Sequence, residues 1–307
     1  MILSLCLNPS LDKTVSLPRF SLDAPNRVTP QREDVGGKGV NVARAATALG
    51  APCLLLGLDF DHSPVAVAMR EAGVRFHLLP GFGKLRTNWK IQETSTGRTI
   101  EINESGPILP DDTLNAVEDA LRLALRPGDW ATLSGSLPPG AGKETYARLA
   151  RTVAEAGAFA AVDCDGPALQ AAVKARPALI KPNAQEFAAL TGADPASQAE
   201  CLAACRELIK EGVGAVCLSR GGEGALLVTP EGAWACPAAQ VKPQGLQGAG
   251  DSLLAGLLTA FLRGLQGGEA LAFASAAAGA SVKRPGTLLC EKKDVEALLP
   301  TLSWREV

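Results

Sequence analysis

Short apolar runs alternate with segments of helical periodicity along most of the chain. The apolar runs predict strands over residues 3–7, 53–58, 130–133, 158–163, 179–181, 215–218 and 225–228. Apolar side chains that recur every three to four residues predict helices over residues 41–49, 64–72, 112–125, 143–156, 167–174, 184–190, 198–211, 252–263 and 269–282. Several helices precede a glycine suited to a left-handed C-cap: Gly50, Gly73, Gly192 and Gly212. Strands interleaved with helices predict an α/β fold whose mostly parallel sheet is covered on both faces.

Two segments interrupt this alternation. Residues 13–35 carry three prolines between residues that favour strands, and residues 84–102 alternate polar and apolar around a short turn. Strand-rich segments that leave an α/β body can pair into a small separate sheet, which would act as a lid or as a dimer surface. We therefore expect a single domain over residues 1–307, with a lid subdomain formed by about residues 12–35 and 84–103.

A glycine-rich stretch, GLQGAGDS, begins at Gly245 and leads directly into the predicted helix over residues 252–263. Free N–H groups and the positive dipole end of that helix can bind an anion, and the glycines let a phosphate approach the backbone. Asp251 in this stretch either caps the helix, a contribution of about 1 kcal/mol, or is a base that deprotonates an attacking hydroxyl. Both interpretations fit the stretch alone.

The same stretch differs from the common nucleotide-binding signatures. It does not fit the P-loop pattern, and Leu253 stands where the third glycine of a dinucleotide fingerprint would be. That fingerprint also follows the first strand, whereas GLQGAGDS lies late in the chain. Motif placement therefore argues against an NAD-binding oxidoreductase.

A second glycine-rich stretch, VGGKGVNVA, opens the predicted helix over residues 41–49. Adjacent glycines permit close approach of the backbone to a ligand, Lys38 supplies a cation, and Asn41 projects from the first helical turn. A flexible turn with a solvated lysine explains each of these residues singly, but it explains the set less well.

Three further polar loops follow predicted strand ends, where ligands bind in open α/β sheets. Their sequences are SGSLPPG from Ser134, KPNAQE from Lys181 and SRGGEG from Ser219. Asn183 and Glu186 are three residues apart at a predicted helix start, so a capping pair explains them as well as a binding role does.

Histidines are scarce, with two in a chain of 307 residues. Zinc hydrolase chemistry and a Ser-His-Asp triad therefore lack their usual components, and acid–base chemistry falls to a carboxylate. The 30 basic and 32 acidic residues nearly balance, so we expect no nucleic-acid or membrane partner. The N-terminus lacks a basic lead, and no uncharged apolar run approaches the roughly 20 residues of a membrane helix. A cytoplasmic protein is expected.

The eight cysteines are scattered among apolar residues, and no C-x-x-C pair occurs. Cys201 and Cys205 lie one helical turn apart, but two soft ligands without a nearby histidine make a poor metal site. We expect the cysteines to be reduced and to pack as small hydrophobic side chains.

The motifs occur in an order that resembles the ribokinase-like sugar kinases of the PfkB family: GGKGVNVA, SGSLPPG, KPNAQE, SRGGEGALLV and GAGDSLLAG. The opening LNPSLDKTV, together with NRV and KLRTNWKI, resembles the family's hexose-phosphate branch of 1-phosphofructokinases and tagatose-6-phosphate kinases. The resemblance implies a three-layer α/β sandwich with a mostly parallel central sheet and a small β-sheet lid that also forms a homodimer. It further implies a kinase that uses ATP and Mg²⁺ to phosphorylate a ketohexose phosphate.

Carried over position by position, the resemblance implies a role for each site residue. Asp251 would be the catalytic base, and the anion hole for the moving phosphoryl group would comprise Gly248, Ala249 and Gly250. Sugar hydroxyls would be bound by Asp12, Gly37, Asn41 and Ser136. The sugar's phosphate would be bound by Lys38, Arg86 and Arg27, the last from its own or the neighbouring subunit. The nucleotide side would comprise Asn183, Glu186, Ser219, Gly221, Gly224, Gly286 and Thr287, with Glu186 acting on Mg²⁺ through water.

Two departures from the family pattern are visible. Gly245-Leu246-Gln247 replaces a stretch that usually holds a threonine, which affects ATP affinity or donor identity, and Leu85 replaces another threonine before the lid arginine. We expect a fructose-1-phosphate 6-kinase, with tagatose-6-phosphate kinase and fructose-6-phosphate kinase as alternatives. A non-catalytic sugar-phosphate sensor is the alternative of a different class, and the intact Asp251 argues against it.

Overall fold

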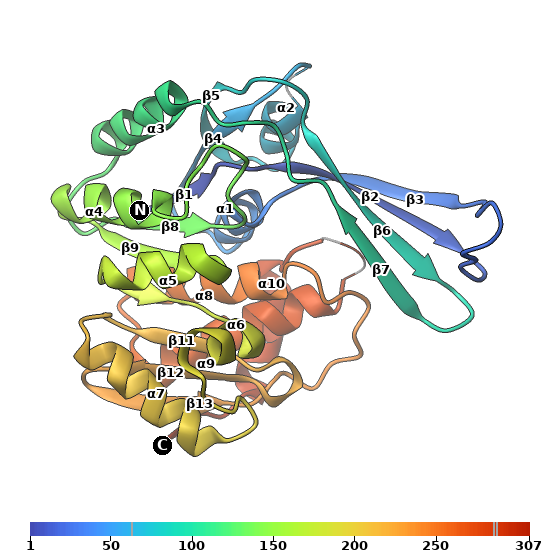
Figure 1. Cartoon of the computed structure of the whole chain (residues 1–307). Coiled ribbons are helices and arrows are strands. Elements are labelled where there is room, and N and C mark those ends of the chain that lie inside the picture. Colours follow the sequence, from blue (N-terminus) through green and yellow to red (C-terminus); the bar gives the residue numbers. More distant parts are fainter. Residues whose placement is uncertain (63, 285, 287) are drawn as a thin grey trace.

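A large mixed sheet lies between two layers of helices in the computed structural model, which describes residues 1–62, 64–284, 286 and 288–307 (Figure 1). Within these residues the strand order is β14-β13-β12-β11-β10-β9-β8-β1-β4-β5. Pairing is parallel from β5 across to β11 and antiparallel from β11 to β14. The strands are β1 (Ile2–Cys6), β4 (Cys53–Asp59), β5 (Arg75–Pro80), β8 (Trp130–Ser134), β9 (Phe159–Asp163), β10 (Leu179–Ile180), β11 (Val216–Ser219), β12 (Ala225–Thr229), β13 (Gly232–Cys236) and β14 (Arg305–Glu306).

The two faces of the sheet carry separate hydrophobic cores. Strand β1 shows why, because successive side chains point to opposite faces: Leu3 and Leu5 belong to one core, Ile2 and Cys6 to the other. The first core is covered by α3 (Asp111–Ala124), α4 (Thr145–Glu155), α5 (Gly166–Lys174), α6 (Ala184–Thr191) and α7 (Gln198–Lys210). The second is covered by α1 (Lys38–Ala48), α2 (Pro64–Glu71), α8 (Ala249–Leu262), α9 (Gly267–Val282) and α10 (Lys292–Leu298). The expected three-layer α/β sandwich is confirmed.

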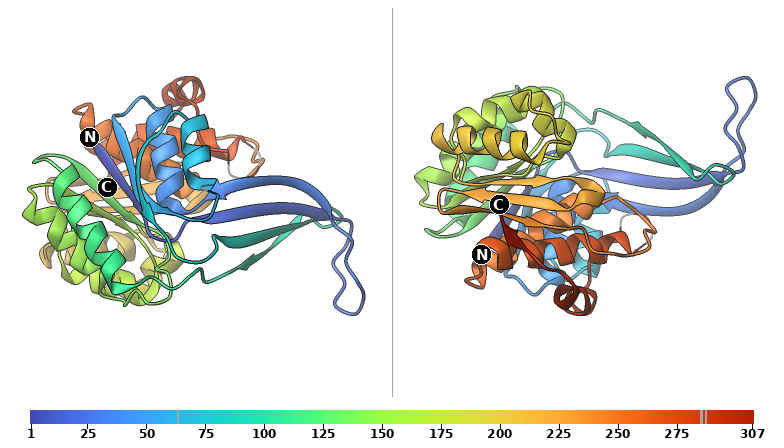
Figure 2. Two further views of the ribbon diagram at one scale, coloured as in Figure 1. Left: turned by 90° about the horizontal axis from the view of Figure 1, so that it is seen from above. Right: turned by 90° about the horizontal axis from the view of Figure 1, so that it is seen from below.

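A small four-stranded sheet projects from one end of this body, as both views in Figure 2 show. Its order is β3-β2-β6-β7, with β2 (Ser10–Leu17) and β6 (Arg86–Glu93) in parallel at the centre and β3 (Thr29–Gly36) and β7 (Arg98–Asn103) at the edges. The two segments that interrupt the strand–helix alternation therefore pair with each other, as expected.

All the strands and helices expected from periodicity are present, with shifted ends. The glycines expected to end helices have positive φ, for example 77° at Gly192. Strands β5, β13 and β14 and helix α10 were not expected: β5 is a largely exposed edge strand, β14 has two residues, and Val295 is the buried residue of α10. Such elements show too little apolar periodicity to be predicted.

The cysteines follow the expectation, because all eight are free and buried. Among the described residues, none of the helices combines the length and the apolar character needed to span a bilayer.

Candidate active site

The strand order creates a natural ligand site at the carboxyl edge of the main sheet. From β1 the chain runs outward to β4 and β5 on one side, and later from β8 to β11 on the other. Ligands of open α/β sheets bind where the strand order reverses in this way. A cavity of about 830 Å³ opens at this edge, between the ends of β9, β10 and β11 and the starts of α1, α6 and α8.

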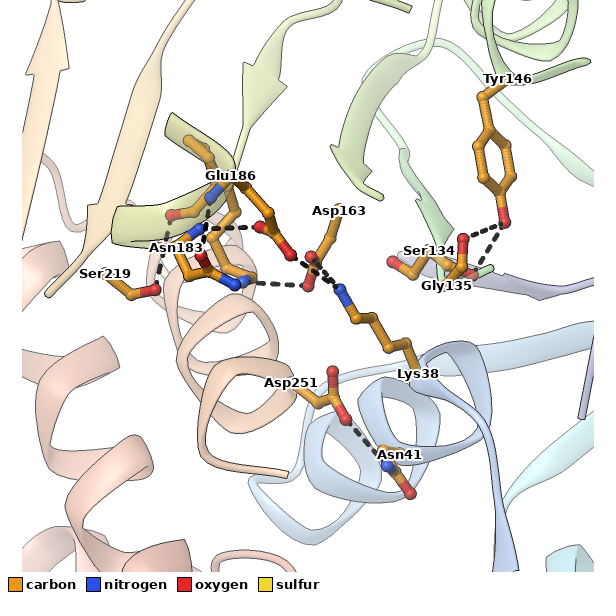
Figure 3. Close-up of polar contacts among 12 residues, drawn as sticks. Lys38, Asn41, Ser134, Gly135, Tyr146, Asp163, Asn183, Glu186, Ser219 and Asp251 are labelled. Atoms are coloured by element: carbon orange, nitrogen blue, oxygen red, sulfur yellow. Dashed lines mark hydrogen bonds and ion pairs between the residues drawn. The ribbon is translucent and has the colours of Figure 1, made fainter. Parts of the chain in front are cut away.

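Asp251 lies in the first turn of α8 and lines this cavity. The helix begins at Ala249, earlier than expected, because Gly248 adopts a left-handed φ of 73° as its N-cap. The Asp251 side chain is 7% exposed, and its Oδ2 accepts a 2.8 Å hydrogen bond from Nδ2 of Asn41 in α1 (Figure 3). Two helices that start far apart in sequence thus present a carboxylate and an amide to each other.

The environment of Asp251 raises the pKa of its carboxyl to about 6. Burial is the main cause, and the negative charge of Asp163 adds to it. Lys38, the Asn41 hydrogen bond and Lys181 act in the opposite direction but do not cancel the shift. A carboxylate with this pKa is ionised at neutral pH and is a stronger base than an exposed aspartate.

A buried group of charges surrounds Asp163, at the end of β9. Its Oδ1 accepts a 2.8 Å hydrogen bond from Nζ of Lys38 (Figure 3). Its Oδ2 lies 3.0 Å from Nζ of Lys181. Burial opposes ionisation of Asp163, but the two ammonium groups outweigh it and lower its pKa. The pKa of Lys38 is raised, because burial is outweighed by Asp163, Asp251 and Glu186. Asp163 therefore stays an anion and holds two cations at the cavity floor.

Lys181 is placed against the glycine turn of α8. A Cβ built at Gly250 would lie 3.3 Å from Nζ of Lys181. The lysine side chain is 4% exposed and lines the same cavity. A positive charge therefore adjoins the backbone N–H groups at the helix start, which makes this point favourable for an anion.

Asn183 and Glu186 form a reciprocal capping box at the start of α6. Oδ1 of Asn183 accepts from the Glu186 backbone N–H at 2.9 Å, and Oε2 of Glu186 accepts from the Asn183 N–H at 2.8 Å. The capping interpretation is confirmed, and it leaves Oε1 of Glu186 only 3.9 Å from Nζ of Lys38. Capping and a role in the cavity are therefore compatible.

Most of the expected phosphoryl-transfer and nucleotide-side residues line this cavity. They are Asn183, Glu186, Ser219, Gly221, Gly224, Gly248, Ala249, Gly250 and Asp251, and Lys38, expected at the sugar's phosphate, lines the cavity as well. Gly286 lies instead beside Arg32 of β3, because a Cβ there would be 3.2 Å from the arginine Cδ. Thr287 lies outside the described residues.

Asp12 is buried in the small sheet rather than open to the cavity. Its Oδ1 accepts hydrogen bonds from Oγ of Ser10 at 2.8 Å and Nδ2 of Asn88 at 3.0 Å. Its Oδ2 accepts from Nζ of Lys90 at 2.8 Å. A Cβ at Gly36 would lie 2.7 Å from the same carboxylate, so Asp12 packs directly beside the VGGKGVN stretch.

Arg86, at the start of β6, ties the small sheet to the end of β1. Its guanidinium donates to the backbone carbonyls of Asn8 at 2.9 Å, Pro9 at 3.4 Å and Glu104 at 3.1 Å. Ser136 lies on the same side, since its Oγ accepts from Nδ2 of Asn8 at 3.3 Å. Arg86 and Ser136 are thereby brought to the base of the small sheet.

The two remaining residues expected at the sugar site lie at opposite ends of β3. Gly37 has a φ of 112°, and a Cβ there would lie 3.0 Å from Sγ of Cys6, so the glycine permits the chain to pass close to β1. Arg27 is exposed in the segment 18–28 that joins β2 to β3 at the far end of the small sheet (Figure 1). A single chain does not bring Arg27 to Lys38 and Arg86.

Comparison with known proteins identifies the architecture. The model of the pfkB family carbohydrate kinases matches residues 7–294. The chain belongs to this family. A 1-phosphofructokinase of Rhodobacter capsulatus is 36% identical over 308 residues, covering 98% of this chain and 96% of that protein. An ATP-dependent 6-phosphofructokinase isozyme 2 of Mycobacterium tuberculosis is 30% identical over 298 residues, covering 96% and 88%.

A solved structure agrees with the sequence comparison. Phosphofructokinase-2 from Escherichia coli, crystallised in complex with substrates and products, has a TM-score of 0.92 and 27% identity, with 98% of each chain covered. As a pfkB kinase, the protein is an ATP-using phosphotransferase that acts on a sugar hydroxyl, and its relatives support a hexose-phosphate kinase.

Two cavity residues, Asp163 and Lys181, were missed as site residues from the sequence. Both close predicted strands, over residues 158–163 and 179–181, and a charged residue at the end of an otherwise apolar strand was an available signal. Their pairing could not be predicted, because it depends on β9 and β10 being neighbours in the sheet.

Proposed function

We propose that this pfkB kinase transfers the γ-phosphoryl group of ATP to the 6-hydroxyl of fructose 1-phosphate, giving fructose 1,6-bisphosphate. The observation that carries the proposal is the position of Asp251, a buried carboxylate beside the N–H groups of α8. Asn41 fixes one of its oxygens, and among the described residues Oδ1 takes part in no hydrogen bond. Oδ1 is thus available to a substrate hydroxyl.

The residues support a direct transfer. The hydroxyl oxygen of the sugar forms a bond to the γ-phosphorus while the bond from that phosphorus to the β–γ bridging oxygen breaks, and Asp251 takes the hydroxyl proton. The N–H groups at the start of α8 and the ammonium group of Lys181 would stabilise the negative charge of the moving group. No histidine and no covalent intermediate are needed.

The site suits a metal ion that arrives with the nucleotide. In the described part of the chain, no group of three or more histidine, cysteine, aspartate or glutamate side chains could hold a metal ion. Mg²⁺ commonly takes phosphate oxygens and water with one or two carboxylates, which fits Glu186 as a partner through water. When bound, the ion would neutralise phosphate charge.

The sugar phosphate would lie between the main body and the small sheet. Asn41 has a buried Oδ1 without a partner, which can accept a hydrogen bond from a sugar hydroxyl. The guanidinium of Arg86 retains N–H groups for the phosphate beyond its carbonyl contacts. We assign sugar hydroxyls to Asp12, Gly37, Asn41 and Ser136 and the phosphate to Lys38 and Arg86.

Exposed apolar side chains on the small sheet support a homodimer in which the sheet acts as lid and interface. Leu22, in the segment that joins β2 to β3, is 90% exposed, and Ile102 on the edge strand β7 is 52% exposed. In such a dimer Arg27 would reach the site of the neighbouring subunit. Light scattering should give twice the chain mass, and an Ile102→Glu variant should shift it towards the monomer; a wild-type monomer would contradict this assignment.

A second candidate substrate is fructose 6-phosphate, favoured by the M. tuberculosis relative and by the fold match to phosphofructokinase-2. The deciding experiment is a turnover panel with Mg-ATP and fructose 1-phosphate, fructose 6-phosphate or tagatose 6-phosphate. We expect the highest kcat/KM with fructose 1-phosphate. A higher value with another sugar would reassign the substrate. Absence of turnover, combined with a raised Tm in one sugar phosphate, would instead indicate a sensor.

A further inference from the structure

A hydrogen bond links the small sheet to the glycine turn of α8. Nε2 of Gln247 donates to Oε1 of Glu101 at 2.8 Å, although the two residues are 146 positions apart. Gln247 directly precedes Gly248, whose left-handed conformation starts the helix that carries Asp251. Glu101 lies on β7, an edge strand of the small sheet. The contact uses a residue from the stretch that departs from the family pattern.

Glu101 ends a row of side chains that crosses all four strands of the small sheet. The strand registers pair Arg32 with Thr14, Thr14 with Lys90, and Lys90 with Glu101. Residues paired across neighbouring strands have side chains on the same face, so this row forms one continuous line. Lys90, in the middle, is the ion-pair partner of Asp12. The row therefore passes beside the assigned sugar site.

Both ends of this row contact the nucleotide side of the molecule. At the β7 end, Glu101 accepts the hydrogen bond of Gln247. At the β3 end, Arg32 packs against Gly286, and Gly245 in turn lies close to Gly286, since a Cβ there would be 2.9 Å from the Gly286 carbonyl oxygen. A displacement of either edge strand of the small sheet would therefore act on the GLQGAGDS stretch, through Gln247 at one edge and through Gly245 at the other.

We propose that Gln247 is a positioning residue that couples the two substrates, so that sugar phosphate bound against the small sheet strengthens ATP binding at the glycine turn. The proposal rests on the proposed function for the identity of both ligands. When sugar phosphate is bound against the small sheet, the hydrogen bond from Gln247 to Glu101 holds the glycine turn in the position set by β6 and β7. Because coupling is reciprocal, ATP must raise the affinity for sugar phosphate by the same factor.

The coupling factor is measurable by calorimetry. The dissociation constant of a non-hydrolysable ATP analogue is measured with and without saturating fructose 1-phosphate, and the reverse titration is run as a check. In Gln247→Val we expect the coupling factor to fall about three- to tenfold, the range of one typical intramolecular hydrogen bond. The sugar affinity without nucleotide should stay unchanged, and Tm should fall by no more than about 2–4 °C, the cost of one hydrogen bond.

Variants of both residues distinguish loss of the Gln247–Glu101 hydrogen bond from other effects of changing either side chain. Gln247→Glu places two carboxylates together and should weaken coupling most, whereas Glu101→Gln retains an amide–amide bond and should keep most of it. Adding Glu101→Gln to Gln247→Glu restores an amide–carboxylate pair and should recover coupling at constant charge on residue 247. Gln240→Val is the matched control, because Gln240 lies in the same loop and bonds the Ala238 carbonyl.

The outcomes distinguish this inference from the proposed function. Unchanged coupling in Gln247→Val, or no recovery in the exchanged pair, overturns the inference while leaving the kinase assignment intact. If another sugar of the panel binds instead, the same titrations are run with it. If no sugar phosphate binds the wild type, both proposals fail together.

Discussion

The main-sheet edge and the small sheet both hold buried carboxylates, but these carboxylates differ in their hydrogen-bond and ion-pair partners. In the small sheet, Asp12 has a lysine partner and two neutral donors, and its ion pair with Lys90 is 8% exposed on each side. At the main-sheet edge, Asp163 pairs with both Lys38 and Lys181. Within the described part of the chain, the side chain that donates a hydrogen bond to Asp251 is the amide of Asn41. The comparison shows how the partners of a buried carboxylate set its pKa: two ammonium groups lower the pKa of Asp163, whereas burial raises that of Asp251, which fits the base that we propose.

The largest effect should follow from removing that base. Asp251→Asn keeps the size of the side chain but cannot take a proton, so kcat should fall by about a thousandfold. Stability should change in the opposite direction. The folded pKa of about 6 lies above the ordinary value of 3.8, so ionisation of Asp251 destabilises the fold as pH rises through that window. At pH 7 the free energy of unfolding of Asp251→Asn should therefore exceed that of the wild type by about 1–3 kcal/mol.

Single-turnover kinetics and chemical denaturation measure the two effects. Asp165→Asn is the matched control, because Asp165 is an exposed carboxylate just after β9 and does not line the cavity. A variant of Asp251 with wild-type kcat would remove Asp251 from the mechanism, and a loss of stability at pH 7 would contradict the sign of its pKa shift.

Removing the paired carboxylate should give the reverse pattern. Asp163→Asn leaves Lys38 and Lys181 without their shared anion, which should cost about 3–5 kcal/mol of folding free energy. It also removes a negative charge that raises the pKa of Asp251, so that pKa should fall. Urea denaturation measures the stability. Glu118→Gln, which breaks a pair with the more exposed Arg148, should cost less. Equal costs would contradict the contrast between buried and exposed pairs.

A smaller effect is expected where the small sheet meets the sugar. Arg86→Ala should raise the KM for sugar phosphate about tenfold or more while the KM for ATP changes little. Because the guanidinium also binds three backbone carbonyls, the variant should lose about 1–2 kcal/mol of stability. Steady-state kinetics with each substrate varied in turn distinguish the sites. The control is Arg98→Ala on β7. An equal rise in both KM values would contradict the assignment of Arg86 to the sugar's phosphate.

Periodicity sufficed for the body of the fold because its strands are continuously apolar and its helices end on glycines such as Gly192. The glycine-rich stretches before two of the helices drew attention to Asp251 and Lys38, because glycines at a helix start leave the backbone open to an anion. Periodicity could not supply contacts that depend on which strands are neighbours. The pairing of Asp163 with Lys181 and the link from Glu101 to Gln247 depend on sheet order and on long-range packing.

The most direct test of the central claim is the pKa of the Asp251 carboxyl in the free protein. In protein labelled with ¹³C at aspartate carboxyls, the Asp251 resonance is assigned as the one absent from Asp251→Asn, and it is followed from pH 4 to pH 8. We predict a midpoint at about 6, because burial and the neighbouring Asp163 disfavour the anion. A midpoint at or below the ordinary value of 3.8 would contradict the proposal that this site raises the pKa of its base.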